Sequence, residues 1–334
     1  RVMTTGTLNT LVGSLAGDAL TTGSNNVALG YRALTTEDAH GFNVAVGHEA
    51  LATLNAGANG YNTAVGYQAG TAMSTGVQNT IIGGLAGDAL TTGGQNVALG
   101  YLALSAEDTG SRNIAIGERA LTNQNYNGAA YNVAVGHDAG KSVTSGVENV
   151  LMGGQTGDAL TTGSYNTAIG HQALTTEDVG SKSTAVGYNA LAAQNVDGDI
   201  LNTAVGYFAG KSITTSTHNT LMGGLSGQSL TEGNLNVAIG YGTLAAETLG
   251  DRNVAIGVNA LNAQNNTSDV DAYNVAIGYE AGTLITTGTA NTLIGGQTGD
   301  ALTTGANNVA IGKDALSGTT TAANNVAIGV SALN

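Results

Sequence analysis

The sequence predicts an all-β protein, a parallel β-solenoid of about nineteen coils, and three observations carry this prediction. The motif Asn-x-x-x-Gly recurs nineteen times, with Ser183 replacing the Asn once. The motifs follow one another every 17 residues, with spacings of 19 three times and of 21 once. Gly accounts for 52 of the 334 residues, and Pro is absent. A short repeat at a regular period, with one strand-like segment per copy, indicates stacked coils rather than a globular core.

The coils are grouped in blocks of four, each about 70 residues long. The third coil of each block is the one that lengthens. Both ends of the chain fall within a coil, so we expect residues 1–334 to be one continuous solenoid domain that is a segment of a longer fibre. The blocks begin near residues 9, 79, 149, 219 and 291. The motifs begin at Asn9, Asn26, Asn43, Asn62, Asn79, Asn96, Asn113, Asn132, Asn149, Asn166, Ser183, Asn202, Asn219, Asn236, Asn253, Asn274, Asn291, Asn308 and Asn325.

Side-chain sizes within the motif alternate as they do in a strand. In the copy that begins at Asn96, Val97 and Leu99 are large, whereas Ala98 and Gly100 are small. A period of two places alternate side chains on opposite faces of a strand. We expect Leu99 to fill the coil interior, and the small face of Ala98 and Gly100 to pack against a neighbouring chain. We expect Asn96 and its equivalents to form a ladder, each amide bonding to backbone or to the next Asn.

The remainder of each coil is expected to hold a second short strand and turns. An Ala recurs seven residues after the motif Asn, as at Ala103, and is followed by Leu or Gly. This pair would begin the second strand. The Thr-Thr-Gly and Glu-Asp segments supply residues that favour turns.

The longer third coils are where we expect a receptor site. Their added residues would protrude as loops, and loops carry binding function more often than the scaffold that holds them. Drift in loop length without any function remains the alternative. The candidate receptor contacts are aromatic residues with Asn-rich neighbours, namely Tyr61, Tyr126, Tyr131 and Tyr273.

Composition narrows the classes of partner. Nine Lys and Arg against 23 Asp and Glu give a net charge of −14. Without a basic stripe to displace counterions from phosphate, we expect no nucleic-acid partner. No apolar run approaches the length of about 18 residues that a membrane span needs, so we expect no membrane insertion. The absence of Cys excludes disulfides and thiolate chemistry, and suits an extracellular or virion protein.

No catalytic or metal-binding constellation is evident, so we expect neither an enzyme nor a cofactor. Adjacent carboxylates such as Glu107 and Asp108 recur without a companion nucleophile, and we interpret them as solvated turn charges. Three of the five His follow the motif Gly, where Tyr otherwise stands, which favours an aromatic ladder over a metal site. The Gly-rich segment before Asp88 is similar to calcium-binding repeats but returns only every fourth coil, which favours a turn role. Thr91 and Thr92 would face opposite ways, which disfavours an ice-binding face.

The motif resembles the repeats of two groups of surface fibres. The segment NTAVGYQA of residues 62–69 is similar to the head repeats of trimeric autotransporter adhesins. It is closer to the repeats of phage tail fibres that end in an intramolecular chaperone domain, the endosialidase type. The resemblance covers essentially the whole chain. It implies a left-handed parallel β-roll and an elongated homotrimer, although the adhesin coil is shorter and no chaperone or anchor sequence is present.

The resemblance implies a structural attachment protein. We expect the shaft or head of a homotrimeric phage tail fibre in the virion, which binds a host surface receptor, either a glycan or an outer-membrane component. Three-fold copies of a weak site would gain avidity. The alternatives are the head of a bacterial trimeric adhesin, or another extracellular fibre, on the cell surface. A third is a tailspike whose depolymerase lies outside this segment.

Overall fold

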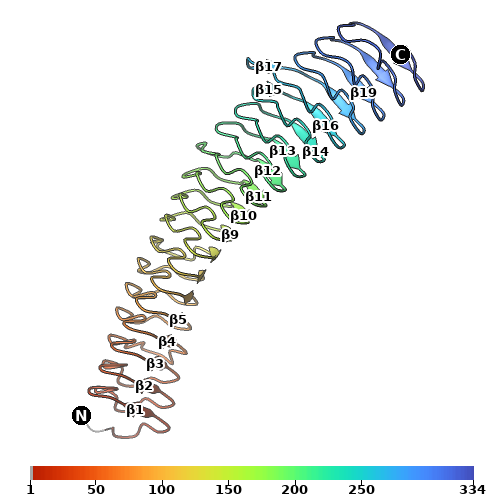
Figure 1. The fold of residues 1–334 in the computed structure, drawn as a ribbon. Helices are drawn as coiled ribbons and strands as arrows, with labels where there is room; N and C mark the ends of the chain where they lie inside the picture. The colour runs from red at the N-terminus through yellow and green to blue at the C-terminus, as the bar shows by residue number, and fades with distance from the viewer. Residues whose placement is uncertain (1–2) are drawn as a thin grey trace. The chain divides into compact units, whose positions relative to one another are not determined.

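The computed structural model describes residues 3–334, which contain β-strands and no helix. They form a parallel β-solenoid with one short strand at each of the nineteen motifs, which confirms the predicted fold class. The chain divides into two compact units, Arg1–Asn166 and Thr167–Asn334. Within each unit, successive coils lie one upon the next (Figure 1). A single continuous domain over 1–334 stays a prediction, and residues 1 and 2 lie outside the described residues.

The motif strands are three residues long and pair in parallel without a register shift, so that Val97 lies opposite Ile114. In the first unit the strands are β1 (Thr10–Val12), β2 (Val27–Leu29), β3 (Val44–Val46), β4 (Thr63–Val65), β5 (Thr80–Ile82), β6 (Val97–Leu99), β7 (Ile114–Ile116), β8 (Val133–Val135) and β9 (Val150–Met152). In the second unit they are β10 (Thr167–Ile169), β11 (Thr184–Val186), β12 (Thr203–Val205), β13 (Thr220–Met222), β14 (Val237–Ile239), β16 (Val254–Ile256), β18 (Val275–Ile277), β19 (Thr292–Ile294), β20 (Val309–Ile311) and β21 (Val326–Ile328). Two shorter strands, β15 (Gly250–Asp251) and β17 (Val270–Asp271), pair with each other at the longest coil.

The coil interior is lined by the small face of the motif, which corrects the predicted orientation of Leu99. Ala98 is 1% exposed, whereas Leu99 is 41% exposed. The interior already holds Ala103 and Leu104 from the opposite side of the coil, and both are fully buried. The remaining space accepts only a small side chain from the strand, so the two large residues of the strand point outward together.

Interior side chains have complementary sizes across the coil. Where the middle strand residue is Ala, as at Ala98, the residue six positions later is usually a large Leu such as Leu104. In the first coil of each block the sizes exchange, and buried Ile81 or Leu151 lies beside a Gly. A Cβ added to Gly157 would lie 2.9 Å from the side chain of Leu151. In these coils, close packing of a narrow interior therefore allows only one of the two positions to be large.

The predicted second strand is wrong, because the segment after each motif is a tight turn. Leu102 and Leu104 have φ angles of 56° and 53°, in the left-handed region that non-Gly residues rarely adopt. Hydrogen bonds between coils offset this strain. The N–H of Leu104 donates to the carbonyl of Ala120 (3.0 Å), and that of Leu102 donates to Gly84 (3.2 Å).

The motif Asn residues form the predicted ladder. The backbone N–H of Asn96 donates to Oδ1 of Asn79 (2.9 Å), and Oδ1 of Asn96 accepts from the N–H of Asn113 (3.0 Å). The Nδ2 of Asn96 donates across the coil to the carbonyl of Gly110 (2.9 Å). Asn96 is 1% exposed, so each of these bonds satisfies a group that water does not reach.

The motif Gly is required by contact between coils of the same chain, not by a neighbouring chain. A Cβ on Gly100 would lie 2.4 Å from the carbonyl oxygen of Gly117 in the next coil. Gly100 also has a φ of 139°, which L side chains rarely adopt. The predicted role of Ala98 and Gly100 as an interchain face is therefore wrong, since Ala98 faces the interior and Gly100 contacts the next coil.

Replacing Gly100 should destabilise the coil stack itself. We expect Gly100→Ala to lower the free energy of unfolding by at least about 2 kcal/mol, because the methyl group meets backbone that cannot move aside. Gly84→Ala is the matched control, since the nearest atom to its added Cβ is a Tyr101 ring carbon at 3.7 Å. It should change stability by no more than about 0.5 kcal/mol. Equal denaturant midpoints for both variants would contradict the close-contact explanation.

Candidate contact surface at the long coils

The four predicted receptor contacts do not form one site. Tyr61, Tyr131 and Tyr273 are about half exposed, and each belongs to a different block. Tyr61 stacks on Phe42 with a ring distance of 5.1 Å. Tyr126 shares the long coil that ends beside Tyr131, and it is only half-buried. Each long coil therefore carries its own local surface.

Two of the predicted receptor contacts, Tyr131 and Tyr273, lie beside an Arg side chain and form small polar clusters. The guanidinium of Arg252 lies over the ring of Tyr273, 5.7 Å from its centre, and the Tyr273 hydroxyl donates to Asp271 (3.1 Å). The guanidinium of Arg112 lies over the ring of Tyr131 at 5.4 Å and donates to its hydroxyl. The cation in each case comes from the coil before the Tyr.

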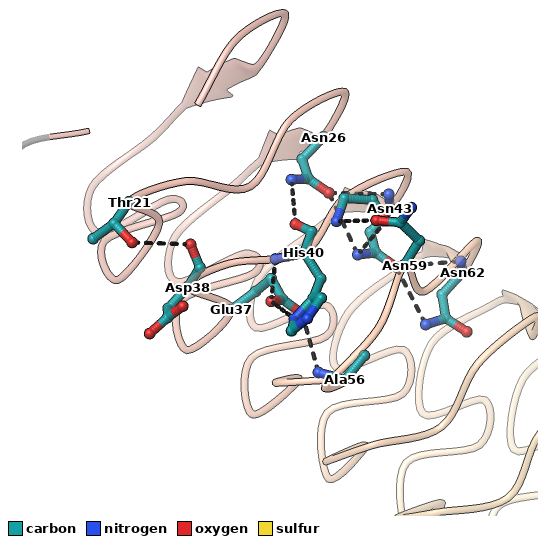
Figure 2. Close-up of polar contacts among 10 residues, drawn as sticks. Thr21, Asn26, Glu37, Asp38, His40, Asn43, Ala56, Asn59 and Asn62 are labelled. Atoms are coloured by element: carbon teal, nitrogen blue, oxygen red, sulfur yellow. Dashed lines mark hydrogen bonds and ion pairs between the residues drawn. The ribbon is translucent and has the colours of Figure 1, made fainter. Parts of the chain in front are cut away.

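A buried Glu in the second coil of each block holds the long loop of the third coil. Sequence reasoning missed this role, because the Glu-Asp pairs were interpreted as solvated turn charges. Glu37 is fully buried, and its carboxylate accepts from the backbone N–H groups of His40 (3.0 Å) and Ala56 (3.2 Å). Figure 2 shows these contacts beside the Asn ladder. The carboxylate thus takes the place of backbone partners that the longer loop lacks.

The longest loop has the largest number of bonds to its Glu. Oε1 of Glu247 accepts from three successive backbone N–H groups that follow it, at 2.8 to 3.2 Å. It also accepts from the N–H of Asn266 (3.0 Å). Oε2 accepts from the amides of Gln264 (2.8 Å) and Asn266 (2.9 Å). A carboxylate with this many donors can stay buried without a cation.

The position before the third motif of each block sets the charge of the loop surface. It is occupied by Phe42, Arg112, Lys182 and Arg252 in the four blocks. The position three residues before the fourth motif holds Asn59, Ala129, Asp199 and Asp271.

These two positions lie in neighbouring coils. Lys182 pairs with Asp199 (2.6 Å), and Arg252 pairs with Asp271. Within the described residues, Arg112 has no ion pair, since its block has Ala129 at the acidic position.

A shallow groove of about 330 Å³ lies beside Arg112 in the first unit. Its half-buried lining residues, called the floor below, are Val77, Gly94, Ser111, Gly128 and Ala129, and its exposed lining residues, called the edge, are Gln78, Gln95 and Arg112. The N–H at Nε of Arg112 donates to Oε1 of Gln95 (2.9 Å). Ser111 and Ala129 are joined by a parallel β-bridge, so the long loop forms one end of the groove.

The residues after the motif Gly form the predicted aromatic ladder in places. In the first unit the rings of Tyr31 and His48 are 5.1 Å apart, and those of His48 and Tyr67 are 5.4 Å apart. In the second unit Tyr188 stacks on Tyr207 at 5.5 Å. The rings contact one another from coil to coil, and Tyr67 and Tyr207 remain about half exposed.

No protein-family model, curated protein or solved structure matches the chain. In the part of the chain that the structure describes, no three His, Cys, Asp or Glu side chains gather as a metal site would require. The same residues contain no helix that is long and apolar enough to cross a membrane.

The buried glutamates should give the protein a specific pH dependence. Burial raises the pKa of Glu107 and Glu177 above the ordinary value, although backbone N–H donors oppose the shift. Between the unfolded and the raised folded pKa, the folded state holds a proton that the unfolded chain releases. The contribution of Glu107 to stability should therefore grow as pH falls and be lost as pH rises through the folded pKa.

The test compares melting temperatures of the wild type and Glu107→Gln between about pH 7 and pH 5. The wild-type melting temperature, relative to that of the variant, should rise as pH falls. Glu148→Gln serves as the control, because Glu148 is exposed and does not bond to a long loop, and this variant should show no such trend. A constant difference for Glu107→Gln would contradict the assignment.

Proposed function

We propose that the chain is a structural segment of a homotrimeric surface fibre, the shaft or head of a phage tail fibre that attaches the virion to its host. The main support for this proposal is that the outward face of the motif strands is uncovered. All-parallel sheets are normally covered on both faces. Here the coil interior covers one face, and nothing in the described chain covers the other.

On the outward face, the third residue of every motif strand is a large apolar side chain, whereas the first is Val, Ile or Thr. In the first unit, Leu29, Leu99 and Met152 are 44%, 41% and 40% exposed, although each is a large aliphatic or thioether side chain. None of the motif strands contains a charged residue. Continuous apolar surfaces of this kind mark protein interfaces. Two further copies of the same chain would cover it with a repeat of identical spacing.

The long coils are the attachment part of the proposal. Their loops are held by buried glutamates, and two of them lie beside an exposed Tyr and an exposed Arg, residue types that are enriched among those that dominate binding energy. Three copies per fibre would convert a weak contact with a host glycan or outer-membrane component into tight attachment. The proposal includes no catalytic step and no cofactor, and the same arrangement would serve the head of a bacterial trimeric adhesin.

The trimer is tested by mass under native conditions. We expect a species with three times the 32.9 kDa mass of one chain. Replacing Ile82, Leu99 and Ile116 together by Asp should yield folded monomers, because it would bury nine like charges at the interface. Asn125→Asp, at an exposed loop position, is the control and should leave the trimer intact. A wild type that is monomeric at tens of micromolar would contradict the proposal.

A further inference from the structure

We propose that the groove beside Arg112 binds a saccharide through a carboxylate, as in a uronic acid residue, with the Arg112 guanidinium as its anchor. The proposal deepens the attachment function and rests on it for its biological role. Binding itself is a property of this groove and does not require the fibre to be trimeric.

Arg112 lacks the carboxylate partner that its equivalents have. Lys182 and Arg252 occupy the same place in their blocks, and each pairs with an Asp of the adjacent long loop. In the block of Arg112 that Asp is replaced by Ala129. The guanidinium is held instead by the uncharged partners Gln95 and Tyr131. It has five N–H donors, of which these two bonds use two. The guanidinium of Arg112 is therefore held in one orientation with unused N–H donors, which suits it to bind an anion from outside the chain.

The same replacement opens the groove. Gly94 and Ala129 stand where the last block has Asn234 and Asp271, so the floor beside Arg112 lacks the longer polar side chains found there. Gly128, with a φ of 144°, carries the loop past Arg112 without adding a side chain. The volume of about 330 Å³ is at the lower end of the range of ligand pockets, about 300–1,000 Å³.

The edge of the groove offers the polar groups that a sugar needs. Gln78 and Gln95 are exposed, and Nε2 of Gln95 donates to Oε1 of Gln78 (3.2 Å). The series Gln78, Gln95 and Arg112 therefore runs over three successive coils. Amide groups at the spacing of coils, about 4.8 Å, can bond to hydroxyls of one or two adjoining sugar rings.

A single negative charge fits the site better than a double one. Arg112 is the one cation lining the groove, and a guanidinium binds a carboxylate through two parallel hydrogen bonds. Glu148 is exposed two coils farther on, beyond Tyr131, and the chain has a net charge of −14. This surrounding negative charge disfavours a phosphate dianion. A uronate, with one carboxylate among hydroxyls, matches the charge and the polar edge together.

The test introduces an Asp at position 129, where the two equivalent loops have one. Ala129→Asp reproduces the pairing seen at Asp199 and Asp271, so the loop is expected to fold as its equivalents do. Binding of tetragalacturonate to the whole chain is followed by ligand-observed NMR and titration calorimetry. The wild type should bind it, and its methyl ester, which has the same sugars without the charge, should bind at least roughly ten-fold more weakly. Ala129→Asp and Arg112→Gln should each weaken binding by a similar factor.

The matched control is Asp199→Ala, which leaves the groove at Arg112 untouched and should bind like the wild type. Unchanged binding by Ala129→Asp would overturn the proposal. So would equal binding of the methyl ester, or preferential binding of a phosphorylated tetrasaccharide. Attachment is scored separately as adhesion of the trimer to host cells. Carboxylate-dependent binding without adhesion would support the groove while contradicting the attachment function, and adhesion unaffected by Ala129→Asp would place the receptor contact elsewhere.

Discussion

The buried Asn ladder is the constraint on which the rest of the structure depends. A side chain such as Asn96 bonds at once to the coil before it, the coil after it and the far side of its own coil. Both ends of the amide are used, and Oδ1 of each Asn requires the backbone N–H of the next motif to lie in register. Residues added elsewhere in a coil must therefore be accommodated without moving the strand.

The long coils show how added residues are accommodated. The strands on either side of each long coil keep their register, as where β7 pairs with β8 across a 19-residue spacing. The extra residues instead leave the coil as a loop that donates backbone N–H groups to a buried carboxylate, as Tyr126 does to Glu107 and Asn266 to Glu247. Variation is thus confined to the loop, where exposed Tyr and Arg side chains lie. A rigid repeat with one variable side is a suitable framework for a multivalent contact surface.

Sequence alone predicted the number of coils, the motif strands and the Asn ladder, because these follow from period and alternation. It could not decide which face of the strand points inward. That choice depends on the space left by Leu104, which lies across the coil and has no signature in the motif itself. The buried glutamates were missed because a neighbouring Asp suggested solvent. Their signal was present, since Glu247 persists where Thr248 replaces that Asp. The groove could not be predicted from the motif alone, because it depends both on an Arg112 without an ion pair and on small residues beside it.

Hydrogen exchange at the motif Asn tests the ladder most directly. The backbone N–H of Asn113 donates only to a side chain, Oδ1 of Asn96, so its protection reports that one bond. In the wild type it should exchange as slowly as strand amides, and in Asn96→Ala it should lose protection while coils several repeats away keep theirs. The account would be contradicted if the wild-type amide of Asn113 exchanged as fast as that of the exposed loop residue Asn127.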